Sequence, residues 1–276
     1  MTDIQHFTTP DGIEIAFTDE GEGLPVIALS GLTRNLRDFD FVALHLPGVR
    51  LIRMDYRGRG QSGWADWSTY AVPNEGGDVI GLMQHLGIER AAFLGTSRGG
   101  LISMFLAATQ PDKVIGVCLN DVGPVVDREG LKVIDSYIGR APKAKTLDEM
   151  AEVRAGTVNG FEDVPMSRWR DEAERSYRET GDGLELRYDP ALRESFLAAM
   201  EAETPDLWPL FNALAGKPLA VVHGAGSDVL TDATVAEMRA RRPDLLYARV
   251  PGRGHAPFLD EPEALDVIHA WLDACA

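Results

Sequence analysis

Apolar and polar positions alternate between two patterns along most of the chain. Short apolar runs predict buried strands, and segments with apolar residues at helical spacing predict helices. The first two runs flank Pro10-Asp11-Gly12, a turn signal that predicts a β-hairpin. The expected strands are 4–8, 13–18, 25–29, 49–54, 91–94, 114–119, 218–222 and 245–250. The expected helices are 70–86, 101–109, 232–241 and 262–274.

The pattern changes between residues 125 and 209, where Glu, Arg and Ala are frequent and the spacing is helical. Strands that alternate with helices on either side of this region predict a doubly wound, mostly parallel α/β sheet with helices on both faces. We therefore expect a core formed by residues 1–124 and 210–276, with an α-helical cap at 125–209 inserted into it.

The composition narrows the choice of partners. The 27 Lys and Arg against 43 Asp and Glu give a formal net charge of −16. Such a surface repels nucleic acids and anionic membranes, so we expect a small-molecule substrate. The first residues lack the pattern of a signal peptide, and no apolar run is long enough to span a bilayer, which predicts a cytoplasmic protein. A homodimer remains open.

Cys118 and Cys275 are the two cysteines of the chain. We expect free thiols at both positions, because Cys118 lies in a predicted buried strand and a pairing with Cys275 is not favoured. Neither cysteine has a histidine or a second cysteine at metal-ligand spacing, so no metal is expected. No cofactor is expected either.

The candidate nucleophile is Ser97, within residues 95–99 (G-T-S-R-G). This pentapeptide lies between a predicted strand and a predicted helix, so Ser97 should sit at the tip of a sharp turn. Glycines at both ends allow such a turn, because side chains there would clash with the strand and the helix. A serine hydroxyl is a weak nucleophile at neutral pH and needs a base and an oxyanion site.

Two later segments supply a candidate acid and base. Residues 221–228 run from a strand into a polar loop that ends at Asp228, and residues 250–255 run from a strand into a glycine-rich loop that ends at His255. We expect His255 to accept the proton of Ser97 and Asp228 to orient the imidazole. Asp228 could instead cap the following helix, and Asp121, at the end of strand 114–119, is the rival acid.

The order Ser, Asp, His and two further motifs resemble the α/β-hydrolase-fold superfamily, over essentially the whole chain. Residues 55–62 (D-Y-R-G-R-G-Q-S) and 254–262 (G-H-A-P-F-L-D-E-P) are similar to its conserved turn and histidine loop. The resemblance implies an eight-stranded sheet and a serine esterase or lipase-like activity. It also implies an oxyanion donor at the backbone N–H of Leu32, where Ser30 replaces the family's frequent histidine. The second donor should be the N–H of Arg98.

Substrate contacts are expected from Arg34 and from the cap. Arg34 follows the oxyanion loop and could meet a substrate carboxylate, although a solvated loop arginine is the simpler interpretation. Trp208 is the first choice among aromatic residues that could line an apolar pocket. The full set of these aromatic residues is Trp169, Tyr177, Tyr188, Phe196, Trp208 and Phe211.

The candidate catalytic residues predict a serine hydrolase that cleaves small or medium carboxylic esters through an acyl-enzyme, without a cofactor. A carbon–carbon bond or lactone hydrolase could use the same three residues. A ligand-binding receptor with vestigial hydrolysis is the alternative from another class. Dehalogenase and epoxide-hydrolase activities are disfavoured, because those relatives carry aspartate where this chain has Ser97.

Overall fold

The computed structural model describes residues 3–203 and 205–276. An eight-stranded sheet has the order β1-β2-β4-β3-β5-β6-β9-β10. β1 pairs antiparallel with β2 and β2 with β4, whereas all other neighbours are parallel. This confirms the predicted fold class. The strands are β1 (Gln5–Thr8), β2 (Glu14–Glu20), β3 (Leu24–Leu29), β4 (Val49–Met54), β5 (Ala91–Thr96), β6 (Val114–Asn120), β9 (Leu219–Gly224) and β10 (Leu246–Val250).

Helices cover both faces of this sheet, because successive strand residues point to opposite sides. Ile27 of β3 packs toward α2, α3 and α9, and its neighbour Val26 packs toward α1 and α10. The short 3₁₀ turns are η1 (Leu36–Phe39), η2 (Trp67–Thr69) and η3 (Pro111–Lys113). The helices on the sheet are α1 (Asp40–Ala43), α2 (Val72–His85), α3 (Arg98–Thr109), α9 (Asp232–Arg241) and α10 (Pro262–Cys275).

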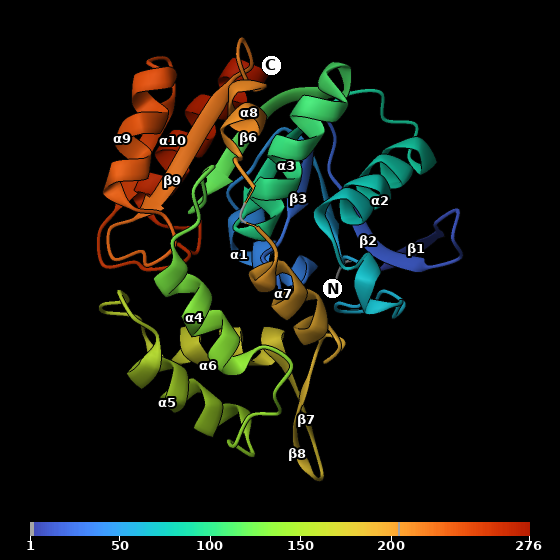
Figure 1. Ribbon diagram of the computed structural model, residues 1–276, viewed down its shortest axis with the longest axis vertical. Coiled ribbons are helices and arrows are strands. Elements are labelled where there is room, and N and C mark those ends of the chain that lie inside the picture. Colours follow the sequence, from blue (N-terminus) through green and yellow to red (C-terminus); the bar gives the residue numbers. More distant parts are fainter. Residues whose placement is uncertain (1–2, 204) are drawn as a thin grey trace.

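The chain between β6 and β9 is mostly helical, and α4, α5 and α6 lie together at the bottom of Figure 1, away from the sheet helices. The prediction of helical structure alone is wrong at one place, where a two-stranded antiparallel hairpin forms around Gly181 and Asp182. Glycine and aspartate between two alternating segments favour such a turn. The elements of this region are α4 (Arg128–Tyr137), α5 (Leu147–Thr157), α6 (Met166–Ser176), β7 (Tyr177–Thr180), β8 (Gly183–Leu186), α7 (Leu192–Glu201) and α8 (Trp208–Asn212).

Within residues 3–203 and 205–276, no helix combines the length and the apolar character that crossing a membrane requires.

Candidate active site

Ser97 lies at the tip of the turn between β5 and α3. Its backbone has φ +50° and ψ −112°, a strained conformation for a residue other than glycine. The neighbouring glycines permit the turn, because a Cβ on Gly99 would lie 2.0 Å from the carbonyl oxygen of Leu29. A Cβ on Gly95 would lie 2.5 Å from the backbone of Gly99. The close approach of β5, α3 and the end of β3 therefore fixes Ser97 at the tip of the turn, where it is partly buried.

A chain of hydrogen bonds runs from Ser97 through His255 to Asp121. His255 Nε2 lies 3.0 Å from Ser97 Oγ, and His255 Nδ1 lies 2.7 Å from Asp121 Oδ2. Asp121 is fully buried at the end of β6 and accepts two further hydrogen bonds, from the N–H of Gly224 at 2.8 Å and the hydroxyl of Ser227 at 2.6 Å. The carboxylate is thus held from three sides.

The structure corrects the predicted acid, because Asp228 has no hydrogen bond to His255 within the described chain. The loop after β9 turns at Ser227, whose hydroxyl oxygen accepts the N–H groups of Val229 and Leu230. This turn directs Asp228 to the wall of a cavity instead. Asp121, the rival weighed from the sequence, follows the strand next to that of Ser97 and takes the position on the imidazole.

The loop after β3 passes directly beside Ser97. A Cβ on Gly31 would lie 3.9 Å from the Cβ of Ser97. The carbonyl groups of this loop are held by the segment that follows β4. Tyr56 donates its hydroxyl to the carbonyl of Ser30 at 3.1 Å, and Arg59 Nε donates to the carbonyl of Leu32 at 3.0 Å. These contacts fix the two peptide planes on either side of the Gly31–Leu32 peptide, which carries the N–H of Leu32.

Asp55 anchors the same two segments to each other. Its carboxylate accepts the N–H groups of Leu36 at 2.7 Å and Gln61 at 2.8 Å. A Cβ on Gly60 would lie 2.0 Å from Asp55 Oδ2, so only glycine fits there. Burial raises the pKa of Asp55 to about 6, and the carboxylate is therefore mainly ionised at neutral pH. Asp55 therefore has a structural role in holding these two segments together.

Glu75 of α2 connects the loop after β3 with the turn that carries Ser97. Its fully buried carboxylate pairs with Arg59 at 2.7 Å on one side and with Arg98 Nε at 2.7 Å on the other. Arg59 holds Leu32, and Arg98 directly follows Ser97. Nothing in the sequence pattern singled out Glu75, because its partners come from different segments. The side chain of Arg98 thus forms an ion pair, while its backbone N–H is the candidate oxyanion donor.

We expect Glu75→Gln to lower the free energy of unfolding by about 3 kcal/mol, because it leaves the buried Arg59 guanidinium without its counter-charge. Urea unfolding followed by circular dichroism measures the change. Glu129→Gln is the matched control, since Glu129 forms an exposed ion pair with Lys132 at 2.5 Å and should change stability by less than about 1 kcal/mol. Equal stability of the two variants would contradict the importance of this buried network.

Ser97 and His255 open onto a cavity of about 760 Å³ between the carboxyl ends of the strands and the helices of residues 125–209. Arg34 lines this cavity, but its guanidinium is already engaged. Arg34 Nε donates to both oxygens of Asp38 at 2.9 and 2.8 Å, and the other nitrogens contact Glu172 and Ser176. The alternative of a solvated loop arginine is therefore wrong, and Arg34 has no free charge to offer.

The aromatic candidates separate into two groups. Trp169, Tyr177 and Tyr188 line the cavity. Trp208 does not, and the prediction that placed it first is wrong. Its ring packs edge-on against Phe211 at 5.7 Å and lies under the guanidinium of Arg241 at 3.9 Å, on the helix layer that covers the sheet. α8 belongs to this layer, which the sequence spacing alone could not reveal.

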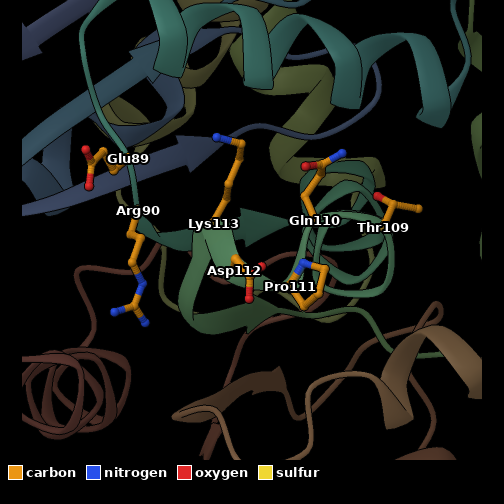
Figure 2. Close-up of a pocket in the computed structure, with 7 residues that line it drawn as sticks. All are labelled: Glu89, Arg90, Thr109, Gln110, Pro111, Asp112 and Lys113. Carbon is orange, nitrogen blue, oxygen red and sulfur yellow. The ribbon is translucent and has the colours of Figure 1, made fainter.

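A second hollow lies at the amino ends of two central strands, where Arg90 precedes β5 and Lys113 precedes β6. Figure 2 shows the charged ends of Glu89, Arg90 and Lys113 pointing in different directions, without a common centre. Because ligands of such sheets bind at the carboxyl ends of the strands, this hollow is not a candidate active site.

Comparisons with known proteins identify relatives of this chain. A 3-hydroxybutyrate-oligomer hydrolase from Cupriavidus necator is 38% identical over 253 residues, which cover 88% of this chain and 86% of that protein. A 2-(acetamidomethylene)succinate hydrolase from Mesorhizobium japonicum is 26% identical over 264 residues, or 95% of this chain and 92% of that protein. The crystal structure of an alpha/beta hydrolase from Novosphingobium aromaticivorans superposes with a TM-score of 0.91 at 38% identity, covering 99% of this chain and 98% of that chain.

The family model described as "Alpha/beta hydrolase family" matches residues 26–266, most of the chain. The prediction of a hydrolase in this superfamily is thereby confirmed, since relatives of this chain include a named hydrolase and two named esterases. The chain belongs to the alpha/beta hydrolase family.

Proposed function

We propose that this protein is a serine hydrolase that cleaves carboxylic esters through an acyl-enzyme. The observation that carries the proposal is the hydrogen-bonded series Ser97–His255–Asp121, which opens onto the cavity. A nucleophile, a base and a group that orients the base are the three parts that acyl transfer by serine needs.

Each residue has one role in this mechanism. Ser97 Oγ attacks the ester carbonyl carbon while its proton passes to His255 Nε2. His255 then gives that proton to the alcohol oxygen as the C–O bond breaks, and the alcohol leaves. A water molecule next loses a proton to His255 and attacks the acyl-enzyme, and the carboxylic acid departs as Ser97 regains its proton. Asp121 stabilises the imidazolium in both halves.

The tetrahedral intermediates carry a negative oxygen that requires donors. We assign this role to the backbone N–H groups of Leu32 and Arg98, as the sequence suggested. Support comes from the bonds that hold the peptides on either side of the Leu32 N–H, and from Glu75, which pairs with both Arg59 and Arg98. Donors that are fixed before the reaction stabilise the developing charge without a cost of reorganisation.

The helices of residues 125–209 form the far wall of the cavity, and we propose that they act as the cap that selects the substrate. The relative at 38% identity is named for hydrolysis of 3-hydroxybutyrate oligomers, which are small aliphatic esters. A cavity of about 760 Å³ is within the range that accommodates a small ligand of this kind. Short hydroxyalkanoate esters are therefore the substrate class we favour.

A substrate panel tests the proposal. We would measure initial rates with p-nitrophenyl esters of increasing acyl length, the linear 3-hydroxybutyrate dimer, a lactone and a vinylogous diketone. The proposal predicts steady-state turnover that is fastest for linear esters. Faster cleavage of the diketone or the lactone would favour the alternative hydrolase, and a stoichiometric burst without turnover would favour a receptor.

A further inference from the structure

Arg154 of α5 is a cation without a carboxylate partner in the cavity onto which Ser97 opens. Within residues 3–203 and 205–276, no ion pair or hydrogen bond involves its guanidinium, and its buried Nε has no hydrogen-bond partner. The ring of Trp169 lies beside it, with its centroid 5.9 Å from the guanidinium carbon, and the charge of Glu172 acts on Arg154 without forming an ion pair with it. A buried donor without an acceptor costs free energy, which is a reason to look for a missing ligand.

The other charges of the cavity do not supply that acceptor. Glu172 lies in the same cavity, but its carboxylate is bound by Arg34 and approached by Arg168 at 3.8 Å. Arg168 is held mainly by Asp260 at 2.8 Å. Burial, together with the nearby charge of Arg34, lowers the pKa of Arg154. An anion bound beside Arg154 would offset the burial and the repulsion by Arg34, and so would favour the charged form of Arg154.

The cavity wall as a whole is cationic, in contrast to the chain with its formal net charge of −16. Two of its basic side chains, Arg140 and Lys143, are exposed at the wall. A local excess of positive charge attracts anions into a cleft even when the rest of the surface is acidic. The basic residues in the wall are Arg34, Arg140, Lys143, Arg154 and Arg168, and the acidic residues are Asp38, Glu172 and Asp228.

We propose that Arg154 binds a free carboxylate on the substrate while the ester carbonyl lies at Ser97, so that this hydrolase prefers acidic esters to neutral ones. The proposal rests on the ester hydrolysis proposed above. Arginine suits this task, because its planar fork donates two parallel hydrogen bonds to a carboxylate. The sequence suggested Arg34 as the residue that contacts a substrate carboxylate. We assign this contact to Arg154 instead, because Arg34 is already neutralised by Asp38 and Glu172.

A binding experiment on Ser97→Ala tests this assignment without turnover. The ligands are the linear 3-hydroxybutyrate dimer, which carries a free carboxylate, and its primary amide, which has the same shape without the charge. We expect calorimetry to give at least about tenfold tighter binding of the acid, the value of a charge-assisted hydrogen bond. Adding Arg154→Gln should remove this preference, and Arg154→Lys should retain part of it.

Arg170→Gln in the same background is the matched control. Arg170 is another arginine of this region, but it is half exposed, pairs with Asp148 at 2.7 Å and does not line the cavity. The Arg170→Gln substitution should therefore leave the tighter binding of the acid over the amide unchanged. Equal binding of acid and amide, no binding of either, or a preference that survives Arg154→Gln would overturn the assignment. Hydrolysis of p-nitrophenyl acetate by the native chain separately reports whether the proposed function holds.

Discussion

Ser97→Ala is expected to lower kcat/KM for an activated ester by at least about 10⁴-fold while the protein remains folded. The substitution removes the atom that forms the acyl-enzyme, and His255 then has no hydroxyl to deprotonate. The turn itself should persist, because it depends on Gly95 and Gly99 rather than on the serine hydroxyl. Steady-state hydrolysis of p-nitrophenyl acetate measures the loss, and urea unfolding checks the fold.

Ser136→Ala provides the control for this experiment. Ser136 also lines the cavity, but its hydroxyl donates to the carbonyl of Val133 in its own helix at 2.6 Å. Its loss should change kcat/KM by less than about threefold, since a helix hydroxyl of this kind contributes little. Turnover by Ser97→Ala at the level of Ser136→Ala would remove Ser97 from the mechanism.

Asp121→Asn is expected to lower kcat by about 10⁴-fold, because an amide at this position favours the wrong tautomer of the histidine. The N–H of Gly224 and the hydroxyl of Ser227 can still contact the new side chain, so the loss should be in rate more than in stability. Measuring kcat alongside the unfolding free energy separates these two effects.

Asp228→Asn is the matched variant, since it makes the same chemical change at the other candidate acid. We expect less than about a tenfold change, because no contact joins Asp228 to His255 within the described chain. A larger loss for Asp228→Asn than for Asp121→Asn would return the role to the residue that the sequence favoured.

Local sequence was enough to predict the sheet and the positions of Ser97 and His255. The turn at Ser97 requires glycines at fixed spacing, and alternating strands and helices favour one kind of parallel sheet. These signals depend on residues that are neighbours in the chain. They can therefore be read from the sequence without knowledge of how the segments pack.

The acid and the substrate contacts depend on contacts between distant segments. Asp121 and Asp228 both follow a strand, and the choice between them is made by the hydroxyl of Ser227, which donates to Asp121 and turns the loop away from His255. Arg34 is neutralised in part by Glu172, a residue of α6. No periodicity in the sequence encodes such pairings, and the position of Trp208 was missed for the same reason.

A fluorophosphonate that mimics the first tetrahedral intermediate reports directly on the nucleophile. Trypsin should release residues 91–98 (A-A-F-L-G-T-S-R), a peptide that contains Ser97. We predict that mass spectrometry finds one phosphonyl group on Ser97, formed with loss of fluoride and in step with loss of esterase activity. Ser97→Ala should carry no label. Full loss of activity with Ser97 unmodified, or a label on another residue, would contradict the assignment of Ser97 as the nucleophile.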